Sequence, residues 1–306
     1  MRKLSFAVAM VSVFTIASAA CGTPAAPPEA AVATGHPYRA EIEKFRHDRE
    51  AKLTSDTGWL TIAGLFFLTK PQTTFGSDPA NDIVLPAGTP ARAGTFTLER
   101  GRVGVKAADG VTFTLEGKPF TSGDLTSDGK GPPDRVALGD VQLWVHQTGE
   151  RLAIRLRDRN NHLRKDFAGL KWYPVNEAYR VEGTFVPYDA PRTVRIPNLM
   201  GDVDTMVSPG HVAFTLNGHK ANMAVVTEND TEFFFIFRDM TSGLDTYPAA
   251  RFLYTARPER GVVTLDFNKA ENPPCAFNPY TTCPLPPAEN RLPIRVEAGE
   301  KMYAAH

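Results

Sequence analysis

Three expected strands each end in an aspartate, at Asp158, Asp239 and Asp266. Arg155 and Arg157 share one face of the first of these strands, because side chains alternate across a strand. Two carboxylates can divide general-acid and general-base roles when their environments separate their pKa values. Guanidinium groups bind carboxylates or phosphates through pairs of hydrogen bonds. If these strands lie side by side, the sequence predicts an anion-binding or hydrolytic site at their ends.

The same residues also have a purely structural interpretation. An aspartate after a strand commonly caps a turn, and an arginine on an alternating strand commonly faces water. Further polar residues in nearby segments could line the same pocket or hold the chain in place. They are Arg164, Tyr173, Tyr247, Arg251, Asn268 and Asn272. Amides satisfy irregular backbone well, so a structural role is favoured for Asn268 and Asn272.

Standard catalytic and metal-binding motifs are absent from the sequence. It has no Gly-x-Ser-x-Gly elbow, no His-Glu-x-x-His pair and no phosphate-binding Gly-Lys-Thr loop. Its seven histidines are scattered, and His211 and His219, which flank one expected strand, are expected in turns. We therefore predict no metal and no cofactor, and the sequence leaves open whether the protein is an enzyme. With 34 basic and 34 acidic residues, it lacks the basic surplus of a dedicated nucleic-acid-binding protein.

The first segment has the layout of an export signal. Residues 1–20 begin with Arg2 and Lys3, continue with a mainly apolar stretch and end in small residues. Cys21 follows, and the Ala/Pro-rich segment 21–36 is expected to be a flexible tether. This arrangement resembles a bacterial lipoprotein processing site. The resemblance implies that Cys21 is lipidated and anchors the chain to the bacterial envelope, outside the cytoplasm, and that the lipid is its contact with the membrane. Ordinary cleavage would instead give a secreted protein.

Cys275 and Cys283 are the other two cysteines. Disulfides persist in exported proteins, and a bridge here would stabilise the fold by about 2.5 kcal/mol in the chain-entropy model. A structural disulfide is therefore expected. Free thiols are the main alternative, because a metal site would need nearby histidine ligands that the segment lacks.

The elements that must position these side chains are mainly β. Residues 38–53 have apolar positions at three- and four-residue steps, which predicts a surface helix. From residue 73 onward, short strands separated by glycine-containing turns at spacings of about 8–12 residues predict antiparallel sandwiches or barrels. Phe233–Phe237 is apolar throughout, so that strand should be covered on both faces. Residues 271–291 contain six prolines and predict an ordered strap.

The expected organisation is two antiparallel β lobes. The first spans residues 37–160 and includes the N-terminal helix, and the second spans residues 161–306 and ends in the Pro-rich strap.

Blocks of sequence between about residues 40 and 300 resemble the domain-of-unknown-function 1684 family. They are Gly58–Leu60, Gly64–Leu65, Thr74–Pro86, Ile154–Asp158, Thr246–Tyr247, Arg251–Leu253, Leu265–Asn268 and Asn272–Cys275. The resemblance implies a bacterial lipoprotein and brings no established reaction.

Gly76 followed by Asn81–Pro86 is similar to the forkhead-associated β-sandwich, which reads phosphothreonine. Ser77 stands where that module needs an arginine. The similarity therefore implies a sandwich fold for the first lobe without phosphothreonine binding.

Three functions remain open from the sequence. The favoured one is an envelope lipoprotein that binds a small molecule or acts as a scaffold for an envelope protein. A hydrolase that uses the Asp/Arg pairs of the second lobe and an interaction module related to the forkhead-associated sandwich are the alternatives. The hydrolase requires two of the three aspartates within about 5–10 Å in one cleft.

Overall fold

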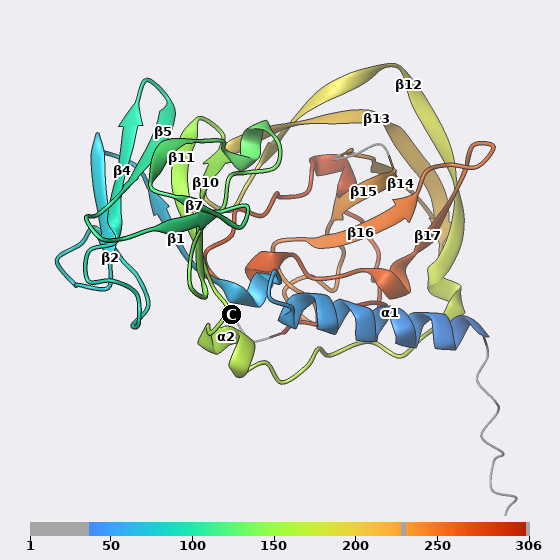
Figure 1. Ribbon diagram of the computed structural model, residues 1–306. Coiled ribbons are helices and arrows are strands. Elements are labelled where there is room, and N and C mark those ends of the chain that lie inside the picture. Colours follow the sequence, from blue (N-terminus) through green and yellow to red (C-terminus); the bar gives the residue numbers. More distant parts are fainter. Residues whose placement is uncertain (1–36, 228–230, 304–306) are drawn as a thin grey trace, which may run out of the picture. The chain divides into compact units, whose positions relative to one another are not determined.

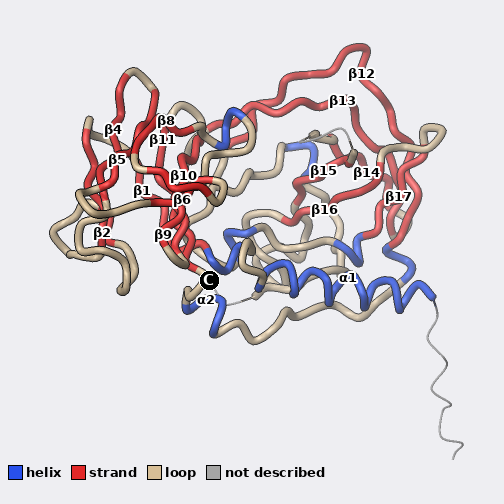
Figure 2. The backbone as a smooth tube through the Cα atoms, viewed as in Figure 1, coloured by secondary structure: helices blue, strands red, loops and turns tan. Residues whose placement is uncertain are grey.

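Strands dominate the computed structural model, which describes residues 37–227 and 231–303 (Figures 1 and 2). The expected signal peptide (1–20), tether (21–36) and lipidation site Cys21 lie outside the described residues. From Tyr38 onward, the described residues belong to one compact unit. The predicted lobe boundary near residue 160 stays a prediction. No helix among the described residues combines the length and the apolar character that crossing a membrane would need.

The predicted N-terminal helix is confirmed as α1, Pro37–Thr54. Tyr38, Ile42, Arg49 and Leu53 are its buried residues, and they recur at helical spacing. Three are apolar, but Arg49 carries a charge into the interior. The short 3-10 helix η1, Trp59–Thr61, then leads into the first strand.

Two sheets share the core of the first β region. The six-stranded sheet has the order β1-β11-β10-β9-β6-β7, and the five-stranded sheet has the order β3-β2-β4-β5-β8. Their bounds are β1 Ile62–Phe67, β2 Gln72–Gly76, β3 Ile83–Val84, β4 Gly94–Glu99, β5 Arg102–Ala107, β6 Phe113–Leu115, β7 Lys118–Phe120, β8 Ser122–Leu125, β9 Val136–Leu138, β10 Val141–Thr148 and β11 Arg151–Asp158. Phe75 and Phe96 of one sheet pack in a cluster with Leu143 and Ile154 of the other. The expected sandwich is thus observed, whereas its finer likeness to the forkhead-associated fold is not confirmed.

The second β region contains a four-stranded sheet, β14-β13-β12-β17, and a two-stranded hairpin, β15-β16. In Figure 1 the long β12–β13 pair passes above β15 and β16, and α1 runs below them. The bounds are β12 Arg180–Pro197, β13 Val203–Leu216, β14 His219–Ala224, β15 Glu232–Phe237, β16 Arg251–Ala256 and β17 Val262–Asp266. The short helices are η2 Asp128–Lys130, α2 His162–Lys165, η3 Glu177–Tyr179, η4 Phe267–Lys269, η5 Pro274–Ala276 and η6 Ala288–Asn290.

Strand β15 is covered on both faces, as its sequence predicts. Phe233, Phe235 and Phe237 belong to the main cluster of this region, and Phe234 and Ile236 belong to a second cluster on the other face. A strand buried on both faces needs no polar alternation, which explains its continuous apolar run.

The strap, residues 271–291, is ordered but carries no disulfide. Cys275 and Cys283 are both free thiols, so the expected bridge is absent from the structure. The backbone N–H of Cys275 donates to Cys283 Sγ over 3.2 Å. Buried amides hold the strap instead. Asn278 donates to Trp59 O, and Asn290 donates to Ala224 O and Ile236 O. The strap is therefore fixed by hydrogen bonds and packing.

Candidate functional site

The β10–β11 hairpin has two chemically different faces. Leu143, Val145, Ile154 and Leu156 point into the sandwich core. On the other face, Trp144 pairs with Arg155 and Gln142 pairs with Arg157, while His146 lies one pair further along. Arg155 and Arg157 therefore do share a face, as alternation requires. Trp59 of η1 lies above this face, with the Arg155 guanidinium carbon 5.8 Å from its ring.

A cavity of about 520 Å³ lies between this face, α1, β16 and the strap. Its volume falls in the range of small-molecule sites, about 300–1,000 Å³. Its walls combine aromatic rings with charged and hydroxyl groups. Phe45, Trp59 and Phe252 supply apolar surface, and Arg155 and Thr282 supply polar groups.

Arg155 is 5% exposed and is poorly partnered for a buried cation. Its nearest carboxylate oxygen, Asp128 Oδ2, lies 3.9 Å from Nη1, which is beyond hydrogen-bond distance. Its Nε has no hydrogen-bond acceptor in the part of the chain that the structure describes. Burial lowers the pKa of Arg155, and the charge of Asp128 opposes that shift. Arg155 therefore lines the cavity without a carboxylate within hydrogen-bond distance.

Two acids share a second arginine on the α1 side of the cavity. Arg49 Nε lies 2.8 Å from Glu300 Oε1 and 3.3 Å from Glu271 Oε2. Burial raises the pKa of Glu271 to about 7, with Arg49 lowering it and Glu300 raising it further. Burial also raises the pKa of Glu300. One cation cannot fully compensate two buried carboxylates, so Glu271 changes charge near neutral pH.

A chain of three side chains runs from η2 through β10 to the strap. Asp128 Oδ2 lies 2.7 Å from His146 Nδ1, and His146 Nε2 lies 3.0 Å from Thr282 Oγ1. The N–H of Gln147 donates to Asp128 Oδ1 over 2.9 Å, and the Trp144 indole donates to Asp128 Oδ2 over 3.3 Å. Burial alone would raise the pKa of Asp128, but hydrogen bonds from His146 and Gln147 and the Arg155 charge hold it below its ordinary value.

Sequence reasoning did not single out Asp128, His146 or Thr282 as site residues. Asp128 and His146 are 18 residues apart, and His146 and Thr282 are 136 apart. No local motif connects residues at such separations. The one available signal was the position of His146 on the same strand face as Trp144.

The three predicted aspartates occupy different hydrogen-bond networks. Asp158 Oδ1 accepts from Asn160 N in a turn. Asp266 Oδ1 accepts from Tyr38 Oη over 2.8 Å. Asp239 pairs with Arg251. No observation therefore favours the hydrolase built from these acids.

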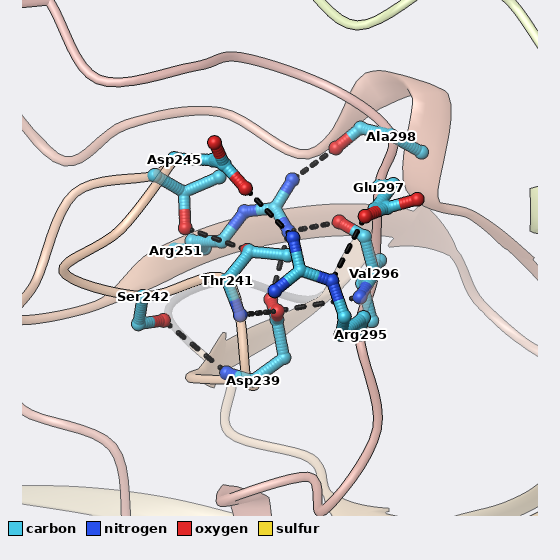
Figure 3. A network of polar contacts seen from close by, with 10 residues as sticks. Asp239, Thr241, Ser242, Asp245, Arg251, Arg295, Val296, Glu297 and Ala298 are labelled. Carbon is cyan, nitrogen blue, oxygen red and sulfur yellow. Dashed lines mark hydrogen bonds and ion pairs between the residues drawn. The ribbon is translucent and has the colours of Figure 1, made fainter.

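Asp239 and Arg251 form a buried ion pair at the start of β16 (Figure 3). Arg251 Nη1 lies 2.8 Å from Asp239 Oδ2 and donates to Val296 O over 2.9 Å, and Nη2 donates to Ala298 O. Asp239 Oδ1 accepts from Thr241 N over 2.7 Å. Figure 3 shows these groups converging on the arginine. The pair joins β16 to the C-terminal segment and does not line the cavity.

Arg157 and Arg164 are both satisfied by their surroundings. Arg157 donates to Thr61 Oγ1, Thr57 O and Gln142 Oε1. Burial lowers the pKa of Arg157 to about 10, with neighbouring arginines adding to the shift. Arg164 pairs with Asp56 over 2.9 Å.

The remaining predicted site residues hold the chain together. Asn268 donates to Asn176 O and to Tyr38 Oη. Asn272 donates through its backbone N–H to Glu300 and through its amide to Lys301 O. Tyr247 donates to Cys275 O over 3.3 Å. Tyr173 is buried, and burial raises its pKa to about 12. The structural interpretation favoured for the two asparagines agrees with these contacts.

No three His, Cys, Asp or Glu side chains gather as metal ligands within residues 37–227 and 231–303.

Comparison with known proteins gives a family and similar solved structures. Residues 165–301 match the model of a family described as "Protein of unknown function (DUF1684)". One of the similar structures is the solution NMR structure of an uncharacterized protein from Haloarcula marismortui, which is 30% identical in sequence. The alignment covers 47% of the present chain and 81% of the Haloarcula chain, with a TM-score of 0.40. No curated protein matches the chain. Thr282 lies within the family match, whereas Asp128, His146 and Arg155 precede it.

Proposed function

The chain belongs to the DUF1684 family, and we propose that it binds a small organic anion in the cavity between α1, β11, β16 and the strap. The ligand class is a carboxylate on a flat apolar body. The observation that carries this proposal is Arg155, a buried guanidinium that lines the cavity while its nearest carboxylate oxygen, on Asp128, lies 3.9 Å away. An unpaired buried cation is costly, and a bound carboxylate would relieve that cost through charge-assisted hydrogen bonds.

The walls of the cavity suit the apolar part of such a ligand. Phe45 and Trp59 present aromatic surface, and Phe252 is 5% exposed at the same cavity. Sites of this kind bury most of a ligand against apolar walls and orient it with a few polar groups.

Calorimetric titration with benzoate, and with benzamide as its neutral counterpart, tests the proposal. Benzoate should bind and benzamide should bind more weakly. Arg155→Met should weaken benzoate binding by about 10-fold or more, because a hydrogen bond to a charged group contributes about 1.5–3 kcal/mol. Arg157→Met is the matched control, because Arg157 is equally buried on the same strand face but does not line the cavity. Equal affinity for benzoate in the wild type and in Arg155→Met would refute the proposal.

Export and lipid anchoring at Cys21 belong to the same proposal. They are supported by the charged start, the apolar stretch and the small residues that precede Cys21. Cys21→Ala should move the protein from the membrane fraction to the soluble exported fraction. Unchanged membrane retention would count against lipidation.

A further inference from the structure

We propose that Asp128, His146 and Thr282 form a hydrolytic relay that cleaves carboxylic esters in this cavity. The inference rests on the proposed function, because the carboxylate that the cavity binds would be the acid product of the reaction. No residue of this relay belongs to the Asp/Arg set that the sequence suggests.

The order and the distances of the three groups match the roles of acid, base and nucleophile. A carboxylate only accepts hydrogen bonds, so the 2.7 Å contact with Asp128 places the proton of neutral His146 on Nδ1. The lone pair of Nε2 then faces Thr282 Oγ1 at 3.0 Å, where it can accept the hydroxyl proton. Such arrangements are recognised by geometry, whatever the order of the residues in the chain.

The aspartate is itself held in place. Its Oδ1 accepts from the backbone N–H of Gln147 at 2.9 Å, and its Oδ2 accepts from the Trp144 indole at 3.3 Å. His146 is 7% exposed, which limits competition from water for its ring nitrogens. Thr282 lines the cavity and is only partly buried, so a ligand can reach its hydroxyl.

Arg155 provides the charge that the reaction needs. It lines the same cavity as Thr282, and its Nη1 lies 3.9 Å from the Asp128 carboxylate of the relay. An ester becomes anionic at its carbonyl oxygen as the nucleophile attacks, and a fixed cation in a buried site stabilises that oxygen. Among the described residues, no carboxylate lies closer to the Arg155 guanidinium than this one.

The chemistry balances with water as the only co-reactant. Thr282 Oγ1 attacks the ester carbonyl carbon while its proton passes to His146 Nε2. The bond to the leaving alkoxide breaks, the alkoxide takes that proton, and the acyl group stays on Thr282. Water then attacks the same carbon and gives its proton to His146. The acyl–oxygen bond to Thr282 breaks, and that proton returns to Thr282. One ester and one water yield one acid and one alcohol, and nothing is oxidised.

The test is hydrolysis of 4-nitrophenyl butyrate by the full chain, followed by release of 4-nitrophenol. Thr282→Val, His146→Gln and Asp128→Asn should each lower kcat/KM by about 100-fold or more, as expected for loss of a nucleophile or general base. Thr282→Ser keeps the hydroxyl and should retain activity. His162→Gln removes an exposed histidine at the start of α2 and serves as the matched control. Benzoate should inhibit competitively.

Trapping the acyl intermediate distinguishes catalysis from a structural role of the same contacts. Acid quenching during turnover, followed by peptide mass spectrometry, should place a butyryl group on Thr282 in the wild type and none in His146→Gln. An adduct on Cys283, or wild-type hydrolysis in Thr282→Val, would overturn the inference.

The two proposals can fail separately. Benzoate binding without any hydrolysis by the wild type would overturn the relay and leave the anion site standing. Hydrolysis that depends on Thr282 but not on Arg155, together with no benzoate binding, would leave the Asp128–His146–Thr282 relay standing but would remove the anion site and the charge-stabilising role of Arg155.

Discussion

Two buried arginines in this chain have opposite surroundings. Arg251 is enclosed with Asp239, and its terminal nitrogens bond to a carboxylate and two backbone carbonyls. Arg155 is almost as buried, but its nearest carboxylate oxygen is 3.9 Å away and a cavity of about 520 Å³ adjoins it. Nε lacks an acceptor in both cases, so the difference lies in the terminal nitrogens and in the neighbouring space. The first arginine is enclosed within the fold, whereas the second adjoins open space, and this difference is the reason that we propose Arg155 as the ligand contact.

The largest expected effect is on the Arg251 pair. Arg251→Met leaves the Asp239 carboxylate buried without its cation, and we expect a loss of about 3–5 kcal/mol in the free energy of unfolding. Chemical denaturation monitored by fluorescence measures it. A loss below about 1 kcal/mol would mean that this pair is no more structural than Arg155 and would break the comparison.

Removing both partners of the pair sharpens this prediction. Arg251→Met combined with Asp239→Leu should recover part of the lost stability, because no unpaired charge remains and hydrophobic replacement of buried ion pairs is often tolerated. The same denaturation experiment on these two variants and on Asp239→Leu alone gives the coupling energy. A double variant that is less stable than Arg251→Met alone would contradict the assigned role of the ion pair.

The cavity region should respond to pH through Glu271. Its folded pKa of about 7 lies above its ordinary value, so between these values the folded state holds more protons than the unfolded state. Stability should therefore fall by about 3 kcal/mol as pH rises from roughly 4.5 to 7. Thermal melts across this range measure the slope, and Glu271→Gln should reduce it. The pKa of Glu300 is also raised, so part of the pH dependence of stability should remain in Glu271→Gln.

Benzoate affinity should follow the same titration. Above pH 7 the ionised Glu271 adds negative charge to the cavity wall, so affinity should decline several-fold between about pH 6 and 8. Calorimetric titration at these two pH values compares the affinities. An affinity that does not decline between these pH values would show that benzoate does not sense the charge of Glu271.

The smallest effect on stability is expected at Arg155. Arg155→Met should change the free energy of unfolding by about 1 kcal/mol or less, because the lost charge makes no short hydrogen bond within the fold. The same variant should lose benzoate affinity. A loss as large as that of Arg251→Met would identify Arg155 as a structural residue and remove the contrast between the two.

Part of the site was predictable because side chains alternate between the two faces of a strand. The order of side chains along β11 is enough to place Arg155 and Arg157 on one face. It does not say which of them meets Thr57 and Thr61 and which meets a cavity. In the structure, Arg157 donates hydrogen bonds to Thr61 and Thr57, whereas Arg155 lines the cavity. The difference arises because η1 and the strap cover the two positions differently.

The disulfide prediction shows a different limit. The expected export of the chain and the short loop between Cys275 and Cys283 predicted a disulfide, but both cysteines are free thiols in the structure. Amide side chains such as Asn290 hold the strap, and the sequence marked Asn272 but not Asn290 for such a role.

Local periodicity in the sequence determined the β-rich architecture, the N-terminal helix, the doubly covered strand β15 and the ordered strap. These features depend on neighbours within a few residues, where alternation and helical repeat govern which side chains are buried. Only the tertiary structure decided that Asp128, His146 and Thr282 meet, and that Arg155 faces a cavity. Contacts between residues more than a hundred positions apart depend on how sheets, helix and strap pack, and no short-range pattern encodes that packing.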